Sequence, residues 1–182
     1  VIGTGPVGLM AVVAAKLRGA GRIIAVGSRA KCRELAIHYG ASNVVNYKDG
    51  DIYAQIMELT GGKRVDRTVI AGGGTEQLPI AYKLTRPGGG IGDLVAADTP
   101  PKIEIDTLDF NRFVAHHKLS GGLCPGGRRR AERLLSLIQY GRVDPSLMLT
   151  HKCYGLDGCR EGFELMHQKP EDLIKPIVYM NV

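Results

Sequence analysis

The sequence predicts an α/β protein built on a doubly wound parallel sheet. From residue 1 to about residue 123, short β-branched runs alternate with helical patterns, and only brief turns separate them. The chain of 182 residues also contains 25 glycines, which cluster in these turns, and its 44% hydrophobic content suffices for a buried core. Beyond residue 123 the alternation is less regular, and we expect a C-terminal α+β segment there.

The elements of the first part follow from two patterns. β-branched runs predict buried strands, and apolar residues at helical spacing predict helices that cover them. The first helix has small and apolar residues on nearly every side, which is typical of a helix buried against a sheet. After a strand stub at 1–2, we expect a helix over 8–17, a strand in 22–27, a helix over 30–39, a strand in 43–47, a helix over 52–59, a strand in 67–74, a helix beginning near Thr75, a turn and strand in 87–97, a helix over 110–115 and a strand in 116–122.

The last part of the chain has a different texture. We expect an amphipathic helix over 129–140, a connector that contains proline, a second helix near 159–167 and a strand in 173–180. These elements do not continue the β–α–β alternation cleanly. We therefore expect two domains, 1–123 and 124–182, with a boundary near Leu123 and with the sequence starting inside a truncated first strand.

Charge and cysteine usage narrow the class of partner. The net charge is +6, and its densest run is Arg128–Arg130 with Arg133 on the expected helix. Few aromatic residues accompany these arginines, so a solvated helix face is favoured over a nucleic-acid site. The four cysteines show no C-x-x-C pairing, which indicates free thiols and no metal site. We find no signal peptide and no stretch long enough to span a membrane, and we expect a cytoplasmic protein.

The segment Gly3-Thr4-Gly5-Pro6-Val7-Gly8 matches the pattern G-x-G-x-x-G between an expected strand and an expected helix. In this context Gly3 makes a tight turn, Gly5 lets a pyrophosphate approach the backbone, and Gly8 lets the helix pack against the sheet. The amino end of the helix then offers N–H groups to the phosphates. The pattern predicts a dinucleotide site of the Rossmann type, and the competing interpretation is a structural turn without a ligand.

The end of the second strand indicates which dinucleotide binds. An acidic residue there would favour the ribose hydroxyl of NAD, whereas this chain has Gly27-Ser28-Arg29. A hydroxyl and a guanidinium are suited to a 2′-phosphate. The sequence therefore predicts NADP over NAD, although an arginine that merely begins a surface helix is the alternative.

The chain resembles the NADP-dependent, zinc-type secondary alcohol dehydrogenases of the medium-chain superfamily. The resemblance covers nearly all of the sequence and is strongest in five stretches, GTGPVGLMAV, AKLRGAGRIIAVGSR, NVVNYKDG, GGLCPGGRRRAERL and KPEDLIKPIV. It implies an oxidoreductase that interconverts small secondary alcohols and ketones by zinc-assisted hydride transfer to or from NADP, in a homotetramer. It also implies that the zinc ligands and catalytic residues belong to a front domain that this sequence lacks, so that this chain alone would be inactive.

The resemblance assigns further residues to the coenzyme. Tyr47 corresponds to a tyrosine at the adenosine end, and Lys169 to a late lysine that reaches the coenzyme. Leu94, Val95 and Ala96 fall where the nicotinamide end is held, but typical members have an asparagine in place of Val95. Two other functions stay open, namely a stand-alone NADP(H)-binding module without activity and a basic interaction domain that uses the arginine-rich helix.

Overall fold

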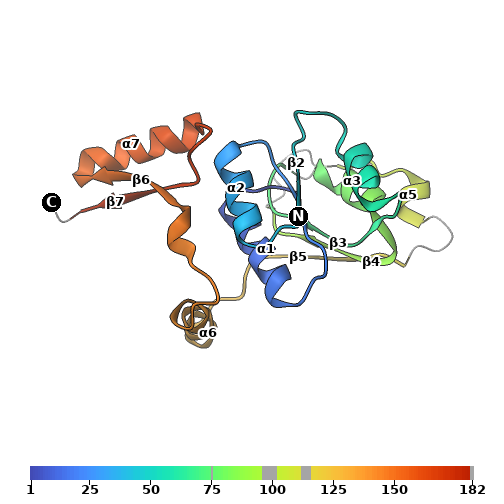
Figure 1. Cartoon of the computed structure of the whole chain (residues 1–182), viewed down its shortest axis with the longest axis horizontal. Coiled ribbons are helices and arrows are strands. Elements are labelled where there is room, and N and C mark those ends of the chain that lie inside the picture. The colour runs from blue at the N-terminus through green and yellow to red at the C-terminus, as the bar shows by residue number, and fades with distance from the viewer. Residues whose placement is uncertain (75, 96–101, 112–115, 181–182) are drawn as a thin grey trace.

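A computed structural model describes residues 1–74, 76–95, 102–111 and 116–180 (Figure 1). Its main sheet is parallel throughout, as predicted. Residue Ile2 forms isolated parallel bridges to Val26 and Ile70 and so joins two groups of paired strands into one sheet. The resulting spatial order is β2, β1, Ile2, β3, β4, β5, which reverses direction at the centre as a doubly wound sheet does. The strands are β1 (Ile24–Val26), β2 (Asn43–Val45), β3 (Val65–Ile70), β4 (Thr85–Asp93) and β5 (Lys118–Gly121).

Helices cover both faces of this sheet. Ala25 and Val26 are neighbours in β1 but belong to different buried clusters, because successive side chains of a strand point to opposite faces. The cluster of Ala25 includes residues of α1 and α2, and the cluster of Val26 includes residues of α3 and α4. The helices of this part are α1 (Pro6–Leu17), α2 (Ala30–His38), α3 (Ile52–Thr60), α4 (Gln77–Leu84) and α5 (Thr107–Asn111).

Several boundaries in this part differ from the sequence-based expectation. The helix expected over 110–115 begins earlier, at Thr107, where the Asp106 carboxylate accepts the Leu108 N–H at 2.7 Å, and residues 112–115 lie outside the described residues. Strand β3 spans Val65–Ile70 rather than 67–74. Helix α1 begins at Pro6 rather than at residue 8, because proline is well suited to a first helical position that needs no N–H donor. Strand β4 begins at Thr85 and includes the glycine run that we expected as a turn. The register with β3 shifts between Val65 and Arg67, and Gly88 has a φ of +74°, so the glycines form an irregular section within the strand. Thr75 lies outside the described residues.

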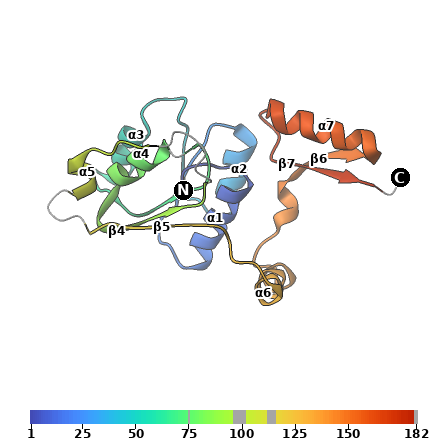
Figure 2. The ribbon, with the colours of Figure 1, turned by 180° about the vertical axis from the view of Figure 1, so that it is seen from behind.

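The last part of the chain forms one more β–α–β unit, which the sequence analysis did not anticipate. Strands β6 (Leu149–Tyr154) and β7 (Lys175–Tyr179) pair in parallel, and α7 (Gly155–Gln168) connects them. Figures 1 and 2 show this unit beside α2, away from the main sheet. Strand β6 escaped prediction because only Cys153 is buried in it, so its sequence lacks the apolar run of an inner strand.

The segment around β6 rests on the helices of the main domain. Met148, at the end of a 3₁₀ turn (Pro145–Met148), and Ile174 belong to the buried cluster of α1 and α2. The hydroxyl of Tyr39 also donates a hydrogen bond of 2.6 Å to the carbonyl oxygen of Asp144. These contacts hold the segment against α1 and α2, and the loop before β7 meets the amino end of α2 through a hydrogen bond from the Ala30 N–H to Glu171.

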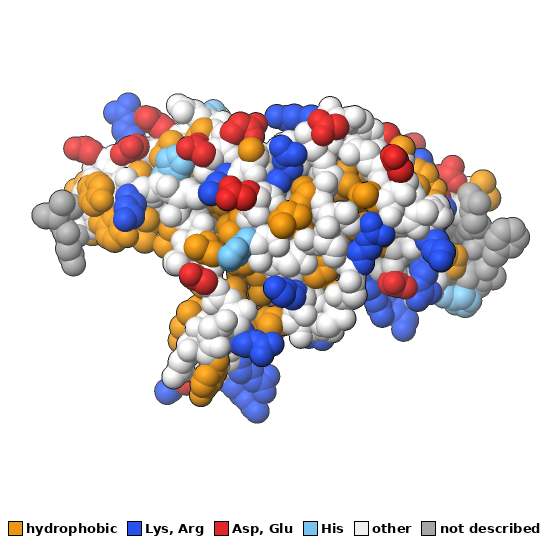
Figure 3. Space-filling model, viewed as in Figure 1, with side chains coloured by type: hydrophobic (Ala, Val, Ile, Leu, Met, Phe, Trp, Pro, Cys, Tyr) orange, Lys and Arg blue, Asp and Glu red, His pale blue; other side chains and the backbone are white. Residues whose placement is uncertain are grey.

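Helix α6 (Arg128–Gln139) behaves differently, since it protrudes from the molecule and has no buried residue. Figure 3 shows hydrophobic and basic side chains side by side on this projection. Leu134 and Leu135 are 53% and 62% exposed, although they form the apolar stripe that the sequence indicated. Arg128 forms an ion pair with Glu132 one turn later, at 2.7 Å.

Candidate dinucleotide-binding site

The glycine turn after Ile2 is packed so tightly that two of its residues have no room for a side chain. A Cβ on Gly3, whose φ is +97°, would lie 2.7 Å from the Cα of Gly72. A Cβ on Gly8 would lie 1.8 Å from the carbonyl oxygen of Gly3. The turn and the first turn of α1 are therefore in direct backbone contact, as the roles expected for these two glycines require.

Gly5 has a different environment. Among the described residues other than its chain neighbours Thr4 and Pro6, the only heavy atom within 4 Å of a Cβ placed there is Nη2 of Arg29, at 4.0 Å. Gly5 is also the N-cap of α1, and no side chain caps the helix, so the N–H groups of its first turn are left for a ligand. No acidic residue occupies that turn, and Val7 is 55% exposed. This end of α1 has the open backbone and the positive helix dipole that a pyrophosphate needs.

Gly27 follows β1 and lies against the glycine turn. A Cβ there would approach Oγ1 of Thr4 to 1.9 Å, so the space beside Gly27 is filled by the threonine side chain. Thr4 is only 5% exposed. Gly27 is thus needed for packing between the ends of two neighbouring strands, a reason that the sequence alone did not reveal.

Ser28 and Tyr47 meet at the carboxyl ends of β1 and β2. The Ser28 hydroxyl donates to the Tyr47 hydroxyl at 2.8 Å, and Tyr47 is 52% exposed. The parallel pairing of β1 with β2 brings these residues together across 19 positions of sequence. Two hydroxyl groups therefore face solvent close to the amino end of α2.

Arg29 is the N-cap of α2, and its guanidinium is partly buried. One of its nitrogens donates to the carbonyl oxygen of Leu173 in the loop before β7. The other terminal nitrogen lies beside Gly5, as described above. The arginine thus bridges the glycine turn and a loop that lies 144 residues further along the chain.

The sequence analysis missed two charged residues at this place, Lys48 and Glu171. Oε2 of Glu171 accepts the backbone N–H of Ala30 at 3.1 Å, and Oε1 lies 3.4 Å from Nζ of Lys48. The Ala30 N–H and then the Lys48 ammonium hold the pKa of Glu171 below its usual value. Lys48 directly follows Tyr47, which the sequence analysis had assigned to the coenzyme, so its position in the sequence could have indicated it. The position of Glu171 had no local signal.

The residues assigned to the nicotinamide end follow β4. The Leu94 N–H donates to the carbonyl oxygen of Ile70 at 2.9 Å, which extends the pairing with β3. The Val95 N–H donates to the carboxylate of Asp93 at 3.0 Å, and its side chain packs on the buried cluster of Val26. Both residues thus lie at the same edge of the sheet as the glycine turn. Ala96 lies outside the described residues.

Lys169 ends α7 with a φ of 50°, in the left-handed region that a lysine rarely adopts. Its backbone N–H closes the helix by donating to the carbonyl oxygen of Leu165 at 2.9 Å. Its side chain is exposed, and it stands two positions before Glu171. The strained backbone therefore precedes the loop that contacts Arg29.

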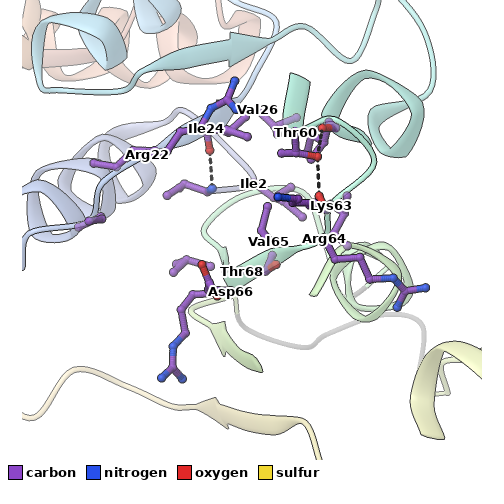
Figure 4. Close-up of a pocket in the computed structure, with 18 of the residues that line it drawn as sticks. Ile2, Arg22, Ile24, Val26, Thr60, Lys63, Arg64, Val65, Asp66 and Thr68 are labelled. Carbon is purple, nitrogen blue, oxygen red and sulfur yellow. Dashed lines mark hydrogen bonds between the residues drawn. The ribbon is translucent and has the colours of Figure 1, made fainter. Parts of the chain in front are cut away.

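A cavity of about 690 Å³ opens at the other edge of the sheet (Figure 4). Ile2 lies in the middle of its lining, with Ile24 of β1 on one side and Val65 of β3 on the other. This is the amino edge of the strands, whereas ligands of open parallel sheets bind at the carboxyl edge. The cavity is therefore separate from the dinucleotide site.

The described residues do not fit a zinc ion. Within residues 1–74, 76–95, 102–111 and 116–180, no three His, Cys, Asp or Glu side chains gather as a metal site would require. The four cysteines are free thiols, and two of them, Cys32 and Cys153, are buried. Over the same described ranges, none of the helices has the length and apolar character of a membrane span.

Comparisons with known proteins agree with this geometry. A family model described as zinc-binding dehydrogenase matches residues 6–139. The chain is 52% identical over 180 residues to an NADP-dependent isopropanol dehydrogenase of Thermoanaerobacter brockii, which covers 99% of this chain and 51% of that protein. An NADP-dependent isopropanol dehydrogenase of Entamoeba histolytica is 47% identical and matches 98% of this chain and 49% of its own length.

Solved structures lead to the same family. The alcohol dehydrogenase TADH of Thermus sp. ATN1 superimposes with a TM-score of 0.81 and 26% identity, over 100% of this chain and 50% of that one. The 2R,3R-butanediol dehydrogenase of Bacillus subtilis superimposes with a TM-score of 0.81 and 27% identity, over 99% of this chain and 50% of that one. The chain spans about half the length of the relatives it matches. These matches confirm the resemblance seen in the sequence, and the chain belongs to the zinc-binding dehydrogenase family.

Proposed function

We propose that this chain is the coenzyme-binding part of an NADP-dependent oxidoreductase that interconverts small secondary alcohols and ketones. The observation on which the proposal rests most is the donor set at the carboxyl edge of the sheet. An open helix terminus at Gly5 lies next to the guanidinium of Arg29 and near the hydroxyl pair of Ser28 and Tyr47. Relatives named as NADP-dependent isopropanol dehydrogenases support the choice of coenzyme and substrate class.

Each end of the coenzyme has its own set of residues in this proposal. The N–H groups at the start of α1, in the turn Gly3–Gly8, would bind the pyrophosphate. Ser28, Arg29 and Tyr47 would bind the 2′-phosphate, because hydroxyl and guanidinium donors satisfy its oxygens and no acidic residue of the β1 end repels it.

At the other end, Leu94, Val95 and Ala96 would hold the nicotinamide, with Lys169 reaching the coenzyme from the end of α7. Bound NADP supplies the hydride acceptor or donor. The residues of this chain bind and orient it. Val95 has no side-chain amide, so any polar contact there would fall to backbone groups.

The remaining parts of the proposal concern the whole protein. We place residues 1–123 in the coenzyme domain and residues 124–182 with a catalytic domain in the other half of the parent chain. The zinc ligands would belong to that half, and the parent would work in the cytoplasm as a homotetramer. The alternative is a stand-alone NADP(H)-binding module, which would bind the coenzyme without turning over any alcohol.

A titration of the purified chain with NADPH and with NADH tests the coenzyme assignment. Binding is followed by the fluorescence of the reduced nicotinamide. We expect NADPH to bind at least about tenfold more tightly than NADH, since one charge-assisted contact contributes about 1.5–3 kcal/mol. Equal affinity for the two coenzymes would contradict the 2′-phosphate assignment.

A further inference from the structure

The loop between α7 and β7 brings a carboxylate into the place proposed for the 2′-phosphate. Glu171 lies 141 residues after Ala30, yet it accepts the backbone N–H of Ala30 at the amino end of α2. Its second oxygen lies 3.4 Å from the ammonium of Lys48. The loop itself is held in position, because Ile174 donates its N–H to the Thr150 hydroxyl at 2.9 Å and Leu173 accepts from Arg29. The backbone of the loop is therefore anchored at Leu173 and Ile174, close to Glu171 in sequence.

The charges around this carboxylate are unbalanced. Arg29 and Arg33 lie one helical turn apart at the start of α2, and Lys48 follows β2. The buried Nε of Arg33 has no hydrogen-bond partner among the described residues. Lys48 and Arg33 both contribute to the lowered pKa of Glu171, after the Ala30 N–H. Two cations, Lys48 and Arg33, therefore act on this carboxylate, while the Arg29 guanidinium binds the carbonyl oxygen of Leu173 in the same loop. This surplus of positive charge suits an anion of higher charge.

A phosphate and the Glu171 carboxylate cannot both use these donors. The carboxylate uses the Ala30 N–H and the Lys48 ammonium. These donors directly follow Arg29 and Tyr47 in sequence, so a phosphate bound by Ser28, Arg29 and Tyr47 would meet the carboxylate there. Two like charges in contact repel one another. The Glu171 side chain is 61% exposed, so it is free to turn into solvent without moving the loop. The ribose hydroxyl of NAD makes no such demand, because a hydroxyl donates to a carboxylate that stays in place.

We propose that Glu171 competes with the 2′-phosphate for these donors and thereby limits how strongly the protein prefers NADP over NAD. The inference rests on the proposed function, since it concerns the same coenzyme site. Glu171 acts here as a specificity-determining residue supplied by a loop far from β1. It takes the part that an acidic residue at the end of β1 has in NAD-binding sheets.

The test is the substitution Glu171→Gln in the whole chain, which keeps the shape and an oxygen acceptor but removes the charge. We expect the Kd of NADPH to fall about threefold to fivefold, the range of a charge at a helix terminus, and that of NADH to rise or stay constant. Adenosine 2′,5′-bisphosphate and ADP, titrated by calorimetry, should show the same contrast without the nicotinamide end. The gain in NADPH affinity of the Glu171→Gln variant should become smaller at high salt, because salt screens the interaction between charges.

Asp172→Asn is the matched control. Asp172 is the next residue of the same loop and is 76% exposed, and its carboxylate lies 3.7 Å from Nε2 of His151, whereas that of Glu171 accepts the Ala30 N–H. This change removes the same charge without freeing the Ala30 N–H, and we expect the affinities for both coenzymes to stay within about twofold, as for other exposed ion pairs. Melting curves of both variants establish that they fold.

The outcomes separate this inference from the proposed function. If the unaltered chain binds NADPH no better than NADH, the coenzyme assignment is wrong whatever Glu171 does. If the unaltered chain prefers NADPH but Glu171→Gln weakens NADPH binding or leaves it unchanged, Glu171 only connects the loop to α2 and the inference is wrong. Should Glu171→Gln unfold, Glu171→Asp provides the second variant. Its shorter carboxylate should reach Ala30 less well and should also strengthen NADPH binding.

Discussion

The two ends of the proposed coenzyme site are built in different ways. The glycine turn at Gly3–Gly8 is contiguous in sequence, and backbone atoms in contact determine its shape. The proposed 2′-phosphate pocket combines residues from the ends of β1 and β2 and from the loop before β7, and its contacts are hydrogen bonds and ion pairs of side chains. Substitutions should therefore act as steric disruption in the turn and as graded electrostatic changes in the pocket.

The largest expected effect is that of Gly8→Ala in the turn. The new Cβ would lie 1.8 Å from the backbone oxygen of Gly3, which no side-chain rotation relieves. We expect a loss of about 3 kcal/mol in the free energy of unfolding, the upper range for overpacking, together with loss of coenzyme binding. Urea denaturation measures the first quantity and NADPH fluorescence the second.

Gly5→Ala is the control for this comparison. Apart from its chain neighbours, no atom of the described residues would lie closer than 4.0 Å to the new Cβ, and the backbone of Gly5 is extended, with φ −69° and ψ −176°. We expect normal stability but weaker NADPH binding, because the methyl group occupies the surface that the pyrophosphate approaches. A Gly5→Ala protein as unstable as Gly8→Ala would show that the turn has no open face.

The second-largest expected effect is on NADPH affinity, and it concerns Arg29 in the proposed 2′-phosphate pocket. Arg29→Gln removes a charged donor from the 2′-phosphate, worth about 2 kcal/mol, so we expect NADPH to bind about thirtyfold more weakly. NADH binding should stay within about twofold, since NAD lacks that phosphate. Lys31→Gln is the control, because Lys31 lies on the same helix but pairs with Glu34 at 2.9 Å. Equal losses for both coenzymes would place Arg29 at the pyrophosphate instead.

The smallest expected effect concerns Lys169, where two substitutions should change stability and NADPH binding independently. Lys169→Gly relieves a left-handed backbone with φ 50°, and we expect the protein to gain about 1 kcal/mol of stability. Binding of NADPH should weaken, because the ammonium group is lost. Lys169→Ala should weaken binding equally without the gain in stability. If NADPH affinity is unchanged in both variants, Lys169 has no part in the site.

Much of the coenzyme half could be predicted from local pattern. Strands β1 to β3 and helices α1 to α4 follow runs of apolar residues, and the glycine spacing located the turn, whereas β5 is exposed along its length. Strand β4 was predicted only in part, because its glycine run suggested a turn but is accommodated within the strand by a shift in register. Strand β6 was missed because it is mostly solvent-exposed and so lacks the apolar run that would mark it.

The sequence by itself determined the doubly wound sheet, the glycine turn Gly3–Gly8 and the presence of Ser28 and Arg29 at the end of its second strand. These depend on neighbours in sequence and on the periodic burial of apolar side chains. Only the tertiary structure decided that Thr4 fills the space beside Gly27, that Arg29 bonds to Leu173, and that Glu171 reaches the amino end of α2. The reason is physical, since contacts between residues distant in sequence arise from how helices and strands pack together, and no local pattern encodes that packing.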